Sequence, residues 1–106
     1  MTGADRKAMK HLYREAIAAT TAVVNDWDPY GLIAGGAPKD EFEIEVSRVV
    51  AGARDVRTPE AMAMVVSKVF SSSFEPERFS VEACQAVASR LFEKLRTSGF
   101  LVVPSP

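Results

Sequence analysis

The chain has 106 residues, of which 47% are hydrophobic and 25% are charged. This length suits one compact domain with one core, and the composition is that of a globular protein rather than of a disordered segment. No apolar stretch approaches the roughly 18 residues that a membrane-spanning helix needs, so we expect no membrane partner.

The chain contains one cysteine, Cys84, within the apolar run VEACQAVASRLF. A single thiol forms no internal disulfide, and a buried, reduced cysteine is typical of a reducing compartment. The polar start MTGADRKAMK lacks the apolar core of a secretory signal. We therefore expect a cytoplasmic protein in which Cys84 is buried.

The net charge is −1, but the acidic side chains are concentrated in one segment. Residues 25–45 carry six acidic side chains and one lysine, a net charge of −5, whereas residues 1–24 and 46–106 carry +2 each. Nucleic-acid binding depends on clustered Lys and Arg that neutralise phosphates, so we expect no nucleic-acid partner. A basic protein surface is a better match for the acidic segment.

Apolar residues at helical spacing predict a long first helix that ends near Trp27. Thr2 and Asp5 resemble a capping box at its start, and Asp28-Pro29 stops it because the residue before proline is pushed out of the helical region. The predicted inward stripe consists of Met9, Leu12, Tyr13, Ala16, Thr20, Val23, Val24 and Trp27.

A long loop is predicted for residues 29–38, which include three glycines and two prolines. The second helix is predicted to begin at Asp40, with Asp40 and Glu43 as a capping box. Its predicted inward face consists of Phe42, Val46, Val49, Val50 and Ala53.

Capping signals also mark the third and fourth helices. Thr58-Pro59 opens the third and Ser80 the fourth, which ends at Ser98-Gly99. Residues 99–106 form an apolar tail that either packs back on the bundle or pairs with another chain; we favour packing. The prediction is an all-α fold: one domain, residues 1–106, folded as a compact bundle of about four amphipathic helices with a long loop between the first two.

The sequence favours no catalytic chemistry. His11 and Cys84 fall on different predicted helices, and phosphate loops and zinc spacings are missing. DWDPYG begins like a calcium loop, but the twelfth position, where a bidentate glutamate belongs, is Ala37. We expect no catalytic residue, no cofactor and no specific metal site.

NDWDPYGL followed by APKDEFEIE, together with MVVSKVFSSSFEPERF, is similar to the YugE-like bacterial domain of unknown function, over about residues 8–95. The motif residues are Trp27, Asp28, Pro29, Gly31, Pro38, Asp40 and Glu41. Tyr30 and Phe42 depart from the aliphatic residue and the tyrosine expected in that pattern. The resemblance implies a compact helical fold and no known activity.

Two interpretations of the WDP loop remain open. In the first, Trp27 and Asp28 form a rigid connector between the first two helices. In the second, an aromatic anchor with an acidic rim binds a partner through Trp27, Asp28, Tyr30, Asp40 and Glu41.

Under the second interpretation the protein is a small interaction module for a basic partner. Such a module would be an inhibitor or an immunity-type protein. The alternatives are a structural homo-oligomer that associates through its apolar tail and, third, a small-ligand or divalent-metal binder near the loop.

Overall fold

The computed structural model describes residues 3–101, with side chains from residue 6 onward, as four α-helices and one short 3-10 helix. In chain order they are α1 (Gly3–Trp27), α2 (Glu43–Gly52), α3 (Pro59–Ser73), η1 (Pro76–Arg78) and α4 (Val81–Thr97). The predicted all-α bundle with a long first interhelical loop is therefore confirmed.

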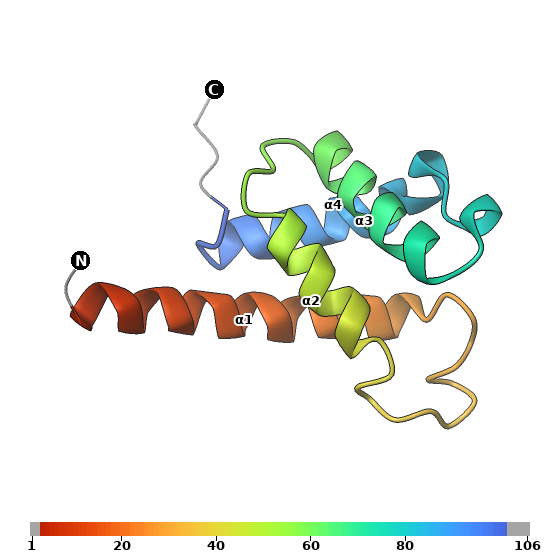
Figure 1. Ribbon diagram of the computed structural model, residues 1–106, viewed down its shortest axis with the longest axis horizontal. Helices are drawn as coiled ribbons and strands as arrows, with labels where there is room; N and C mark the ends of the chain where they lie inside the picture. Colours follow the sequence, from red (N-terminus) through yellow and green to blue (C-terminus); the bar gives the residue numbers. More distant parts are fainter. Residues whose placement is uncertain (1–2, 102–106) are drawn as a thin grey trace.

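α1 runs along the longest dimension of the molecule, and α2 crosses it on the way to α3 and α4 (Figure 1). With 25 residues and a rise of about 1.5 Å per residue, α1 is about 37 Å long, close to the longest extent of 43 Å. Its first turns extend beyond the ends of the other helices (Figure 1).

The hydrophobic core contains residues from all four α-helices. The inward face predicted for the second helix is buried, and α3 contributes Met62, Ala63, Val66 and Phe70. The buried residues of α4 are Cys84, Val87, Ala88, Leu91, Phe92 and Leu95. On α1, however, the first buried residue after residue 5 is Ala16, and Met9 and Tyr13 are 50% and 44% exposed. The predicted stripe is thus buried only in its C-terminal part, because none of the other described helices covers the first turns of α1.

Three of the predicted helix boundaries are confirmed by their hydrogen bonds. The Thr58 hydroxyl accepts from the Ala61 amide at 3.1 Å, and the Ser80 hydroxyl accepts from the Ala83 amide at 3.1 Å. After α4, Gly99 has a φ of 87°, which a residue with a side chain rarely adopts. The amides of Gly99 and Phe100 donate to Arg96 and Leu95, which is the Schellman pattern. The predicted cap at Thr2 lies outside the described residues.

The predicted start of α2 at Asp40 is wrong. The helix begins at Glu43, and its N-cap, Phe42, makes no side-chain capping bond. Residues 39–42 form turns instead, in which the Asp40 carbonyl accepts from the Glu43 amide at 3.0 Å. The Phe42 ring is buried against Phe70 and Phe74, and this tertiary packing outweighs the local capping signal.

The chain after α4 turns back onto the core, where Leu101 is only 3% exposed. Residues 102–106 of the predicted tail lie outside the described residues. Cys84 is buried as expected, and burial raises the pKa of its thiol. Within residues 3–101, no helix has both the length and the hydropathy to span a membrane.

Candidate functional site

Trp27, the last residue of α1, packs into a cluster of aromatic rings. Its ring meets those of Phe70 and Phe79 edge to face, with centroids 5.1 and 5.7 Å apart. Both partners are buried, whereas Trp27 is partly exposed. The indole therefore connects the end of α1 to α3 and to the segment before α4. Its ring contacts with Phe70 and Phe79 stabilise the fold.

Tyr30 lies in the loop and extends the same cluster. Its ring lies 5.3 Å from Phe74 and 5.9 Å from Phe79, and the Arg78 guanidinium lies 4.7 Å above it in cation–π geometry. The tyrosine hydroxyl is shielded from solvent and has no hydrogen-bond partner among the described residues.

Asp28 shapes the loop through both its backbone and its side chain. It has a φ of 44°, in the left-handed region that Asp tolerates better than most residues. One carboxylate oxygen accepts from the Ile33 amide and the other from the Ala34 amide, each at 2.9 Å. Hydrogen bonds from Ala34 and then Ile33 hold the pKa of the Asp28 carboxyl below its ordinary value.

The acidic residues of segment 25–45 have different environments. Asp26 pairs with Arg90 of α4 at 2.8 Å, and Asp28 binds loop amides. Glu45 is only 8% exposed and accepts a hydrogen bond from the Ser73 hydroxyl at 3.0 Å. The remaining three carboxylates are exposed and form no ion pair with any described residue: Asp40, Glu41 and Glu43.

We call these three carboxylates the acidic edge. They lie at the N-terminal end of α2, and Glu43 is in its first turn, near the positive end of the helix dipole. The side chain of Asn25 donates to the Lys39 carbonyl at 2.8 Å and so ties this segment to the end of α1.

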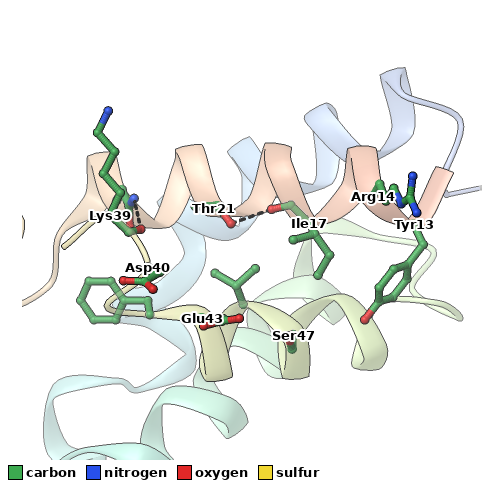
Figure 2. A pocket seen from close by; sticks show the side chains of 11 residues that line it. Tyr13, Arg14, Ile17, Thr21, Lys39, Asp40, Glu43 and Ser47 are labelled. Atoms are coloured by element: carbon green, nitrogen blue, oxygen red, sulfur yellow. Dashed lines mark hydrogen bonds between the residues drawn. The ribbon is translucent and has the colours of Figure 1, made fainter. Parts of the chain in front are cut away.

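An open groove of about 540 Å³ lies beside the acidic edge, between α1 and α2. Figure 2 shows Asp40 at one end of the groove, while Tyr13 reaches from α1 towards the other end of α2. Its floor is largely apolar and includes Ile17, Phe42 and Val46. An apolar groove with charged residues at its margin resembles the centre and rim of a protein interface.

The predicted site residues therefore do not share one environment. Trp27 and Tyr30 belong to the aromatic cluster, Asp28 holds the loop, and Asp40 and Glu41 face solvent. The sequence prediction did not include Glu43 or the groove residues of α1. Tyr13 was predicted to face inward as part of the apolar stripe of the first helix, but the sequence does not show which part of that stripe another helix covers.

The part of the structure with described side chains contains no group of three His, Cys, Asp or Glu residues that is close enough to hold a metal ion. In the calcium-like segment, the Asp26 and Asp28 carboxylates are engaged with Arg90 and with amides. His11 is exposed and bonds to Glu15, one helical turn later, at 3.1 Å.

The fold and this surface define a small all-α domain with an acidic edge beside an apolar groove. The family model of a domain of unknown function, DUF1871, matches residues 19–99, and the chain belongs to that family. Neither the curated proteins nor the solved structures that were compared with the chain gave a match. The match agrees with the sequence resemblance in giving a domain of unknown function, whereas the YugE-like name and its motif remain predictions.

Proposed function

We propose that this protein is a small interaction module whose acidic edge binds a basic protein partner. The observation that carries the proposal is the presence of three exposed carboxylates, unpaired among the described residues, beside an open apolar groove. Asp26, Asp28 and Glu45 each have a structural partner, whereas Asp40 and Glu41 have none among the described residues, and Glu43 has only the helix dipole of α2.

Each predicted contact residue has a role in this proposal. Asp40 and Glu41, joined by Glu43, make the charged contacts, which steer association and favour a positively charged partner. Trp27, Asp28 and Tyr30 hold the loop in place and thereby fix the position of the acidic edge. Within this class we propose an inhibitor or immunity-type protein that occupies a positively charged site, acting in the cytoplasm.

Site-specific photo-crosslinking in the native cells tests the proposal. A photoreactive amino acid at position 41 is expected to crosslink one basic protein that position 82 does not capture. Glu82 is a matched control because it is also an exposed glutamate near the start of a helix, α4. Crosslinks to the same proteins from both positions, or none from position 41, would overturn the proposal.

A further inference from the structure

A second groove, of about 560 Å³, lies at the N-terminal half of α1. We call it the α1 groove. Its apolar lining comes from α1, from the end of α2 and from the chain after α4: Met9, Leu12, Tyr13, Ala51 and Phe100. Met9 and Tyr13 are 50% and 44% exposed, so the α1 groove presents apolar surface that no described residue covers.

Cations lie around this apolar surface. Lys10, Arg14 and Arg54 line the groove, and none of them forms an ion pair with a residue whose side chain is described. Arg6 and Lys7, earlier on α1, are also exposed. Within residues 6–15 of α1 the one acid is Glu15, and it is bonded to His11. The α1 groove is therefore apolar inside and positively charged around its margin.

We propose that the α1 groove binds an acidic amphipathic helix of another protein. Apolar side chains spaced along one face of such a helix would enter the groove, and acidic residues beside them would pair with Lys10, Arg14 and Arg54. This site has the opposite charge to the acidic edge and does not rest on the function proposed above, although Tyr13 and Arg14 line both grooves. Met9, Leu12, Tyr13 and Phe100 lie outside residues 19–99, which the family model matches.

Three other occupants fit the charges or the shape less well. A second copy docked face to face would place cations against cations across the two-fold axis. The chain's own residues 102–106, VVPSP, include no acidic side chain. An anionic membrane is better matched by a protruding apolar face than by a concave one.

Two synthetic peptides of about 14 residues test this proposal. Both carry leucine at positions i, i+3, i+4 and i+7; one has glutamate and the other has lysine at the flanking positions. The glutamate peptide is expected to bind the α1 groove at least about tenfold more tightly than the lysine peptide at low salt, when binding is followed by the signals of Met9 and Phe100, and its affinity should fall as salt is added. In amide NMR spectra of the unaltered protein, it should shift the signals of Met9, Tyr13, Ala51 and Phe100.

A pair of charge-reversed variants shows which residues cause the preference for the glutamate peptide over the lysine peptide. Lys10→Glu with Arg54→Glu should remove or reverse this preference. Arg48→Glu with Lys68→Glu should leave it unchanged, because this lysine and arginine line a different cleft, between α2 and α3. Circular dichroism verifies that each variant is folded, and the NMR mapping does not depend on either variant.

Several results would overturn the proposal. Equal binding of the two peptides at the α1 groove, binding of neither peptide there, or NMR shifts confined to another face would each do so. Tighter binding to phosphatidylserine vesicles would indicate a membrane, and tighter peptide binding by a chain that ends at Leu101 would indicate that the tail occupies the groove. Concentration-dependent dimerisation that shifts Met9 and Tyr13 would indicate a second copy.

Discussion

Asp28 holds the turn that follows α1 by two means, a left-handed backbone and a carboxylate bonded to two amides. Because these bonds favour the ionised form, the folded-state pKa of Asp28 lies below its unfolded value. The resulting stabilisation is fully present above the unfolded pKa of about 3.9 and is lost as the pH falls through the folded pKa.

Replacing Asp28 with Asn should reduce the acid sensitivity of the fold. Asparagine tolerates the same backbone region but carries no charge, so the variant should be less stable at neutral pH and should lose less additional stability below about pH 4. Urea titrations at several pH values measure this. Parallel stability–pH curves for the two proteins in the acid range would contradict the account.

A substitution of Trp27 distinguishes the two interpretations of the WDP loop, a structural connector between helices and an exposed anchor for a partner. Since its ring meets two buried phenylalanines, Trp27→Ala should lower the free energy of unfolding by about 2–4 kcal/mol. Met64 is 63% exposed, and Met64→Ala should change the same free energy by no more than about 0.5 kcal/mol. If Trp27→Ala has as small an effect as the control in urea titrations, the ring contributes little to the core and the anchor interpretation gains support.

At the scale of elements, the helix starts were predictable where local chemistry acts alone. Thr58 and Ser80 form the side-chain caps that their sequences predict. Asp40 offers a similar local signal, but burial of Phe42 moves the start of α2 to Glu43. The contacts of Phe42 with Phe70 and Phe74, which are distant in sequence, set the start of α2. The spacing of residues in the sequence does not reveal such contacts.

Thr58→Ala and Ser80→Ala should each cost about 1 kcal/mol of stability, because each leaves a helix amide without its side-chain acceptor. The two losses should be additive because the caps belong to different helices. Ser72→Ala is the matched control, since that hydroxyl bonds only to the carbonyl of Lys68 within α3. A control loss as large as the losses at the caps would argue against the capping explanation.

The first turns of α1 should contribute little to stability. Residues 6–11 have no buried side chain, so replacing Arg6, Lys7 and Lys10 together with alanine should change the free energy of unfolding by less than about 1 kcal/mol. The hydrophobic stripe through Met9 and Tyr13 predicted burial, because periodicity shows which residues share a face but not whether another helix covers it. A loss of several kcal/mol in chemical denaturation would show that these turns support the core.

At the scale of the whole molecule, the charge count predicted an acidic segment but not its division into structural and free carboxylates. Asp26 pairs with Arg90, 64 residues away, and Glu45 bonds to Ser73, 28 residues away. Neither pairing follows from the local sequence, because each depends on how the helices pack. Asp40 and Glu41 were predicted as contact residues, and their role in binding remains a proposal.

The most direct test of the acidic edge is the affinity of the crosslinked partner for two purified charge-reversed variants, measured by calorimetry. We expect Asp40→Lys with Glu41→Lys to weaken binding at least about tenfold while the thermal unfolding midpoint changes little. Glu60→Lys with Glu82→Lys reverses the same number of charges in the first turns of α3 and α4 and should leave the affinity within about threefold of the unaltered protein. Equal affinities for the two variants would contradict the central claim that the acidic edge is the binding surface.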